Sequence, residues 1–401
     1  MPTSIYAIAT MDTKGEELDY VRRCLTAAGA NVTTVDVGTS SAPTVEPDID
    51  RDTVFGSSWK ANRISDRGEA VAAMSLALTK FLLREQELGK VAGVIGIGGS
   101  GGTSLISAAL RALPIGLPKL IVSTVASGNT APYVSCSDIT LMYSVVDVAG
   151  LNVVSRRVLA NAAHAMAGMV AHTPRDDDSK PVIGMTMFGV TTPCVTRVRE
   201  SLESLGYDGL VFHATGSGGQ AMEKLVESGM IGGVLDITTT EVADEVVGGV
   251  FAAGPERFEA ILERRIPYVM SLGACDMVNF GSRETVPTKF SQRLFHEHNP
   301  QVTLMRTTED ENRAIARWIA SKINRATSVV KLLIPEGGVS MLDAVGQPFY
   351  DPAADAALFD ELEAAVNQDS TRQIVRHPHH INDPEFADQL VQTYLQVARQ
   401  Q

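Results

Sequence analysis

The 401-residue chain lacks the apolar and cysteine patterns of membrane and secreted proteins. No apolar run reaches the roughly 18–20 residues that a membrane helix needs, and no basic segment precedes the first apolar stretch, at residues 5–10. The four cysteines form no CxxC pair, which argues against a disulfide framework and a thiolate zinc site. We therefore predict a protein of the reducing cytoplasm.

Basic residues are also in short supply. Lysine and arginine total 34 against 47 aspartates and glutamates, a formal net charge of −13. Binding to nucleic acid or to an anionic membrane requires a basic surface, so we expect neither as a partner. Hydrophobic residues make up 44% of the chain, which is too many for a disordered protein, and the length predicts two or three domains.

What the chain does have is an alternation of short β-rich runs and amphipathic helical stretches. The first run, residues 5–10, precedes a helical pattern over 16–28 that ends at Gly29, and a second run follows at 32–37. Such alternation predicts an α/β fold, with parallel sheets covered by helices on both faces.

A charged segment bounded by Pro174 and Pro181 interrupts this alternation. We predict a boundary there between a nucleotide-binding domain over residues 1–178 and a substrate or partner domain over 181–401. An ordinary surface turn is the alternative. A helix expected over 383–397 could pack on the second domain or cross back to the first.

The two predicted domains resemble each other. Three features recur with a constant offset of 177 positions: the strand at 5–10, Gly29 and Asp36 correspond to 182–187, Gly206 and His213. Residues 139–147 also resemble 302–310. We interpret the chain as two doubly wound, Rossmann-like parallel-sheet domains from an ancient duplication, with chance similarity as the alternative.

A glycine-rich loop follows the strand expected at 91–97. Its residues are Gly98, Gly99, Ser100, Gly101, Gly102 and Thr103. Glycines let backbone amides approach an anion, and the N-terminus of the helix expected next favours a phosphate. No lysine follows the last glycine, so this is not a Walker A loop. A tight strand-to-helix turn is the alternative.

A second polar motif follows the first expected strand. Its candidate nucleotide contacts are Thr10, Asp12, Thr13 and Lys14. Open α/β sheets bind ligands at the carboxyl ends of their strands, which favours this reading. The alternative is that Thr13 caps the next helix together with Glu16.

Later strand ends in the first domain add further candidates. Ser123 and Gly128 would line the same crevice, and Asp147 with Asn152 offers a carboxylate and an amide suited to Mg²⁺. The alternative for Asp147 is a charge at a helix N-terminus. Arg63 and Arg67 could approach the phosphates, although surface arginine is the simpler interpretation.

The second domain has a different set of candidate groups at its strand ends. The predicted catalytic residues are His213, Glu241, Cys275 and Asp276. An imidazole, carboxylates and a thiol could perform acid–base work or nucleophilic attack, but each could instead be buried or cap a helix. His296 and His298, or the histidines at 377–380, could hold a metal if they lie on a strand; loop histidines are the alternative.

Several of these motifs together resemble one family, long described as uncharacterised. They are Thr10-Met-Asp-Thr-Lys-Gly-Glu16, Ile97-Gly-Gly-Ser-Gly-Gly-Thr103, Asp236-Ile-Thr-Thr-Thr-Glu241 and Ser271-Leu-Gly-Ala-Cys-Asp276. The family is that of ATP-binding proteins related to the N-terminal inhibitory domain of a plant tobamovirus-resistance protein. The resemblance implies two Rossmann-like domains, ATP with Mg²⁺ in the first, and a homodimer. The plant member continues into a TIM-barrel-like domain, which implies such a protein as a possible separate partner.

From the motifs and the resemblance we predict a magnesium-ATP-binding protein that acts as an ATP-dependent enzyme on a small metabolite between its domains. A non-catalytic ATP-binding module for a partner protein is the first alternative. A metal-dependent lyase or isomerase centred on the second domain is another.

Overall fold

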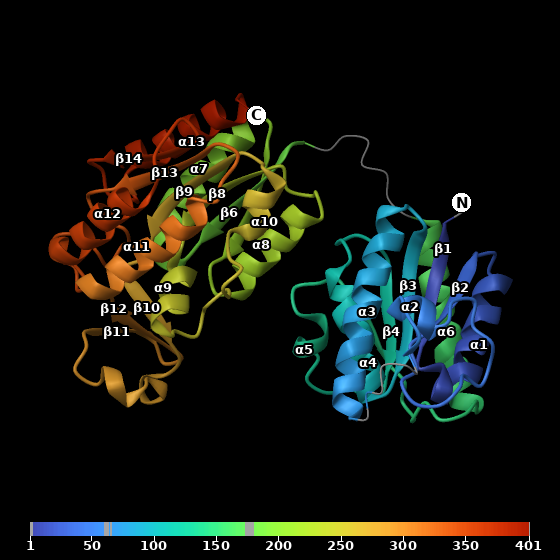
Figure 1. Cartoon of the computed structure of the whole chain (residues 1–401). Helices are drawn as coiled ribbons and strands as arrows, with labels where there is room; N and C mark the ends of the chain where they lie inside the picture. The colour runs from blue at the N-terminus through green and yellow to red at the C-terminus, as the bar shows by residue number, and fades with distance from the viewer. Residues whose placement is uncertain (1–2, 60–63, 65, 173–179, 401) are drawn as a thin grey trace. The chain divides into compact units, whose positions relative to one another are not determined.

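The computed structural model describes residues 3–59, 64, 66–172 and 180–400. The chain divides into two compact units, Met1–Asp177 and Asp178–Gln401, and each is described by itself (Figure 1). None of the helices in the described ranges is long and apolar enough to span a membrane.

The first unit is built on five parallel strands in the order β2-β1-β3-β4-β5. The strands are β1 (Ser4–Ala9), β2 (Val32–Asp36), β3 (Val91–Gly98), β4 (Lys119–Ser123) and β5 (Thr140–Tyr143). The helices are α1 (Met11–Ala27), α2 (Arg51–Phe55), α3 (Arg67–Glu87), α4 (Ser100–Ala112), α5 (Ala131–Val134) and α6 (Val153–Ala171).

Helices cover both faces of this sheet. Ile5 and Ala7 of β1 pack in a cluster with residues of α1 and α6, whereas Tyr6 and Ile8 pack in a cluster with residues of α3 and α4 (Figure 1). Successive strand residues point to opposite faces. Burial on both faces therefore explains why the first strand is an unbroken apolar run instead of an alternating one.

The second unit has six parallel strands in the order β14-β13-β9-β8-β6-β7. They are β6 (Val182–Met187), β7 (Asp208–His213), β8 (Gly233–Thr238), β9 (Tyr268–Gly273), β13 (Val330–Pro335) and β14 (Arg372–His377). A three-stranded antiparallel sheet consists of β10 (Met277–Phe280), β12 (Val302–Arg306) and β11 (Phe295–Asn299).

Helices cover the second parallel sheet as well. On one face lie α7 (Thr192–Ser204) and α13 (Pro384–Ala398). The other face carries α8 (Ser217–Glu227), α9 (Thr240–Val247), α10 (Glu259–Arg264), α11 (Glu309–Ile323) and α12 (Pro352–Ala365). The C-terminal helix α13 packs against α7 and β9 of its own unit, which decides between the two placements open at the level of sequence.

The predicted fold class is confirmed, because both sheets share one strand order. In each unit the second strand lies at the edge, beside the first, and the third, fourth and fifth strands follow on the other side. Gly29 and Gly206 follow equivalent helices with φ angles of 86° and 90°, as the 177-residue repeat predicts.

The second part of the predicted repeat was wrong. Residues 140–143 form the fifth parallel strand β5, whereas 302–306 form the middle strand of the antiparallel sheet inserted after β9. The strand in the second unit that occupies the place of β5 is β13. A short apolar run carries no information about its neighbouring strand, so two similar segments occupy unrelated places.

Candidate functional site

The carboxyl edge of the first sheet brings the two strongest sequence motifs together. Ala9 of β1 pairs with Ile97 of β3, so the segments that follow the two strands start side by side. The chain leaves β1 toward β2 on one side and leaves β3 toward β4 on the other. Open α/β sheets bind ligands at such a switch point.

The glycine loop places the start of α4 directly over the end of β3. A Cβ atom on Gly98 would lie 2.5 Å from the Thr103 backbone nitrogen, so only glycine allows this close approach. Gly99 is the N-cap, and no side chain of the described residues caps the helix. The first amides of a 13-residue helix are therefore available to an anion.

Thr103 and Ser123 lie beneath this loop. Both are buried, and their hydroxyl oxygens are 2.7 Å apart. Ser123 Oγ also accepts a hydrogen bond from the Val125 amide. These two predicted cofactor contacts therefore join α4 to β4, while the exposed Ser100 and the half-buried Gly101 lie at the surface.

The motif after β1 forms one tight turn and then a kink. Thr10 is the N-cap of α1 without a side-chain bond, and its hydroxyl lies 3.2 Å from that of Thr13. The capping box with Glu16 does not form. Lys14 leaves helical geometry at φ −134°, and its ammonium donates to the Val148 carbonyl.

Asp12 has one carboxylate oxygen without a hydrogen-bond partner among the described residues. Its Oδ2 accepts from the Ser40 amide at 3.0 Å. Its Oδ1 is buried and has no hydrogen-bond partner among the described residues. A Cβ atom on Gly38 would lie 3.0 Å from this oxygen, so the oxygen lies close to the Gly38 backbone.

The segment between β2 and α2, residues 37–50, covers one side of this edge, and the sequence did not reveal its role. Asp36 accepts from the Met11 and Gly38 amides at 3.0 and 2.8 Å and pairs with Arg51 at 2.7 Å. The Thr44 amide donates to the Met11 carbonyl. The only signal was an aspartate at a strand end, followed by Gly38. This segment therefore lies beside Asp12, whose carboxylate accepts from the Ser40 amide.

The predicted magnesium ligands have different surroundings. Asn152 Oδ1 accepts from the Val154 and Ser155 amides, both at 2.9 Å, as the N-cap of α6. Asp147 is exposed, and it precedes Val148, which Lys14 contacts. Of the two, Asp147 is thus the one whose side chain is exposed.

The turn before Asp147 is strained. Val145 has φ 67°, and the Val146 amide donates to the Ser144 carbonyl at 2.8 Å. A β-branched residue in this region is a genuine outlier, and such three-residue turns are rare. Backbone strain of this kind clusters at functional sites.

Two arginines and one glycine complete the first set. The guanidinium of the exposed Arg67 lies 4.0 Å from where a Gly101 Cβ atom would be. Arg63 lies outside the described residues. Gly128 is exposed in the segment after β4, where its amide donates to the Val125 carbonyl. Arg67 thus adds a positive charge beside the start of α4.

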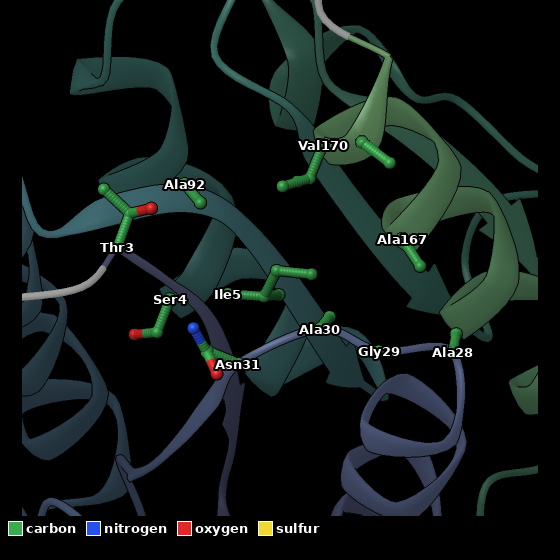
Figure 2. Close-up of a pocket in the computed structure, with 11 residues that line it drawn as sticks. Thr3, Ser4, Ile5, Ala28, Gly29, Ala30, Asn31, Ala92, Ala167 and Val170 are labelled. Atoms are coloured by element: carbon green, nitrogen blue, oxygen red, sulfur yellow. The ribbon is translucent and has the colours of Figure 1, made fainter.

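A separate cavity of about 240 Å³ lies at the opposite, amino edge of the same sheet (Figure 2). It is lined mainly by small side chains, including Thr3, Ala30, Ala92 and Ala167, and Asn31 adds an amide. No ionisable side chain of the described residues lines it. We therefore assign it no chemistry.

In the second unit, Glu241 is part of the packed interior. Its Oε1 accepts from the Gly216 and Gly219 amides at 2.8 and 3.0 Å, and its Oε2 pairs with Arg257 at 2.9 Å. Burial raises the pKa of Glu241, and the Arg257 charge opposes that rise. One oxygen thus bonds to the start of α8 and the other to Arg257, so both are engaged within the interior.

The other predicted catalytic side chains do not form one open site. Cys275 is buried, and burial raises the pKa of its thiol to about 12, which disfavours the nucleophilic thiolate. Asp276 is buried beside Ser340. His213 is exposed at the end of β7, with its ring centroid 5.8 Å from that of Phe188.

The histidine pairs show the predicted extended geometry at one place. His296 and His298 both lie on strand β11, and His377 ends β14. His380 Nε2 lies 2.9 Å from the Ser340 carbonyl. In the ranges that the structure describes, no three His, Cys, Asp or Glu side chains are placed to hold a metal. The lyase alternative therefore has no such preformed three-ligand centre there.

Two family models match the chain. The N-terminal domain of an uncharacterised protein family, UPF0261, matches residues 3–175, and its C-terminal domain matches 180–398. The chain belongs to the UPF0261 family. A UPF0261 protein of Rhizobium meliloti is 54% identical over 98% of this chain and 99% of its own length.

A plant relative confirms the resemblance drawn from the motifs. The ToMV resistance protein Tm-1(GCR237) of Solanum lycopersicum is 49% identical, and the match covers 98% of this UPF0261 chain but 56% of the tomato protein. Among solved structures, the glycosyltransferase SnogD from Streptomyces nogalater is 12% identical with a TM-score of 0.19, which is too low to carry any argument.

Proposed function

We propose that the first unit of this UPF0261 protein binds ATP together with Mg²⁺ at the carboxyl edge between β1 and β3. The observation that carries the proposal is the pairing of Ala9 with Ile97, which sets the Thr10–Lys14 turn beside the start of α4. Phosphates bind to free amides at helix N-termini. ATP itself is what the family resemblance in the sequence predicts.

The side chains at this edge suit a magnesium-bound triphosphate. The amides of Ser100, Gly101 and Gly102 would donate hydrogen bonds to phosphate oxygens, with Arg67 as a neighbouring charge. The unpartnered Asp12 Oδ1 and the exposed Asp147 are the carboxylates that would hold Mg²⁺. The metal would neutralise phosphate charge.

A role without turnover has its own support. Of the four groups expected to act on an acceptor, Glu241, Cys275 and Asp276 are buried, and Glu241 has both oxygens engaged, whereas His213 is exposed. This favours an ATP-binding interaction module over an ATP-dependent enzyme of small-molecule metabolism. Measurement of ATP turnover, alone and with candidate metabolites or a TIM-barrel partner protein, separates the two.

Thermal unfolding with Mg²⁺ and ATP tests the binding proposal. At a ligand concentration 100-fold above its dissociation constant, binding adds about 2.7 kcal/mol to stability. A rise in Tm with ATP and Mg²⁺, and not with phosphate alone, is the expected result. An unchanged Tm at millimolar nucleotide would contradict the proposal.

A substitution in the loop locates the site. Gly101→Asp puts a negative charge at the start of α4, where a Cβ meets nothing closer than 4.0 Å. We expect this variant to fold and to lose the ATP-dependent rise. Gly168, in α6, also has open space around its Cβ position. Gly168→Asp is therefore the control and should keep the ATP-dependent rise in Tm. An undiminished rise in Tm in Gly101→Asp would show that the nucleotide binds at another place.

A further inference from the structure

The residue that follows β4 lies beside the start of α4. Gly98, the last residue of β3, pairs with Ser123, the last residue of β4. One position further along each segment are Gly99, the N-cap of α4, and Thr124. The Thr124 amide donates a hydrogen bond to the Gly98 carbonyl at 3.3 Å, so the backbone of Thr124 is held directly against the glycine loop.

The Thr124 hydroxyl lies close to the position from which a helix is normally capped. A Cβ atom on Gly99 would lie 3.9 Å from Thr124 Oγ1. The side chain of an N-cap residue extends from its Cβ atom to the second or third amide of the helix. Gly99 has no such side chain, so the Thr124 hydroxyl is the polar side-chain group beside the place where one would begin.

This hydroxyl is not used by the fold. Thr124 is half-buried, and its side chain makes no hydrogen bond within the part of the chain that the structure describes. The preceding Ser123 differs, because it is buried and its hydroxyl oxygen lies 2.7 Å from that of Thr103. Ser123 therefore joins α4 to β4, whereas the Thr124 hydroxyl is available to a ligand.

The corresponding position in the second unit has no hydroxyl. Thr238 pairs with Gly273 at the ends of β8 and β9, so Ala274 takes the place of Thr124. Ala274 is fully buried, and its amide donates to the Val339 carbonyl at 2.9 Å. The second unit thus covers this position with its own chain, whereas the first unit places a half-buried hydroxyl there.

The charges around the hydroxyl favour an anionic ligand. The first turn of α4 contains no acidic residue, and a helix N-terminus has a partial positive charge. The Arg67 guanidinium lies 4.0 Å from where a Gly101 Cβ atom would be. A hydroxyl in such surroundings donates its proton to an anionic oxygen, and hydrogen bonds of this kind are stronger than those between neutral groups.

We propose that Thr124 is a further binding residue of the first unit, and that its hydroxyl donates a hydrogen bond to a phosphate oxygen of the nucleotide. The inference rests on the nucleotide site proposed above. The amides at the start of α4 bind the phosphate from the helix, and Thr124 binds it from the segment after β4. The contribution of Thr124 to affinity comes from its hydroxyl alone.

Titration calorimetry of the whole protein with ATP and Mg²⁺ tests this inference. Thr124→Val keeps the shape of the side chain and removes the hydroxyl, so we expect the Kd for magnesium-ATP to rise about tenfold or more. Thr124→Ser keeps the hydroxyl and should bind nearly as tightly as wild type. Thr140→Val is the matched control, because this exposed threonine begins β5, and its Kd should equal that of wild type.

A wild-type Kd in Thr124→Val would overturn the role of Thr124 and leave the nucleotide site standing. Equal losses of affinity in Thr124→Val and Thr124→Ser would also overturn it, because the hydroxyl would then not be the group that binds. If the wild-type protein bound no magnesium-ATP, the proposed function itself would fail, and this inference with it. Thr124→Ala removes the same hydroxyl and replaces Thr124→Val if the valine variant does not fold.

Discussion

At the scale of residues, charges in the second unit serve its interior. Arg257, with a side chain only 2% exposed, contacts Asp236 at 2.8 Å, Glu241 at 2.9 Å and Glu223 at 3.1 Å. Tyr268 and Thr186 donate further hydrogen bonds to Asp236. A buried charge network whose members are all bonded fixes one arrangement of the elements that carry it.

Arg257→Met should strongly destabilise the second unit. The substitution leaves three carboxylates buried without their cation. Removing one partner of a buried ion pair typically lowers the free energy of unfolding by about 3–5 kcal/mol. Urea unfolding measures the change. Arg313→Met, at an exposed pair with Glu309, is the control and should leave the midpoint unchanged. A midpoint as high as wild type in Arg257→Met would mean that the network contributes little.

Cys275 should be inert toward alkylation in the folded protein. Its thiol is fully buried with a raised pKa, whereas Cys24 and Cys136 are half-buried. Iodoacetamide at pH 7, followed by peptide mass spectrometry, should label the latter two first, and Cys275 only after denaturation. Rapid labelling of native Cys275 would restore it as a candidate nucleophile.

At the scale of elements, the question is whether Asn152 serves the helix or a metal. The Asn152 side chain accepts hydrogen bonds from two backbone amides at the start of α6, and the Ser155 hydroxyl completes a capping box. Loss of such a cap typically costs about 1 kcal/mol. The residue type suits both roles, and only the local geometry separates them.

In the absence of nucleotide, Asn152→Ala should lower the free energy of unfolding by about 1 kcal/mol. Asn152→Asp should retain most of the wild-type stability, because aspartate can also cap the helix. Asn161→Ala, exposed in the middle of the same helix, is the control. Chemical denaturation of the three variants without ATP provides the measurement. Equal stability of Asn152→Ala and wild type, with loss of magnesium-ATP binding, would instead favour the metal role.

At the scale of the whole molecule, each unit has its own sheet and its own cores. The first unit packs two clusters on the faces of its sheet, and the second packs its principal clusters on the faces of its own. Units with complete cores generally fold alone.

Residues 3–177 expressed alone should therefore unfold cooperatively. If the ATP site lies within the first unit, the fragment should show the same nucleotide-dependent rise in Tm as the full chain. Circular dichroism with and without Mg²⁺ and ATP makes the comparison. A folded fragment without the rise would show that binding requires residues of the second unit.

The sequence alone determined the α/β class, the two parallel-sheet units and the family. Alternating buried strands and amphipathic helices are local patterns, and so are the motifs at residues 10–14 and 98–103. The position of these two motifs beside each other followed from the rule that strand ends of a parallel sheet share an edge. Local signals and one topological rule were sufficient for this much.

Only the tertiary structure decided which polar side chains are available. Glu241 and Asp12 both follow strands, yet one has each oxygen bonded within the core and the other has a buried oxygen without a donor. The hydrogen bond of the Ser340 hydroxyl to Asp276, 64 positions away, is likewise absent from any local pattern. Burial and partners depend on contacts between distant segments, and these set both the ionisation and the accessibility of a side chain.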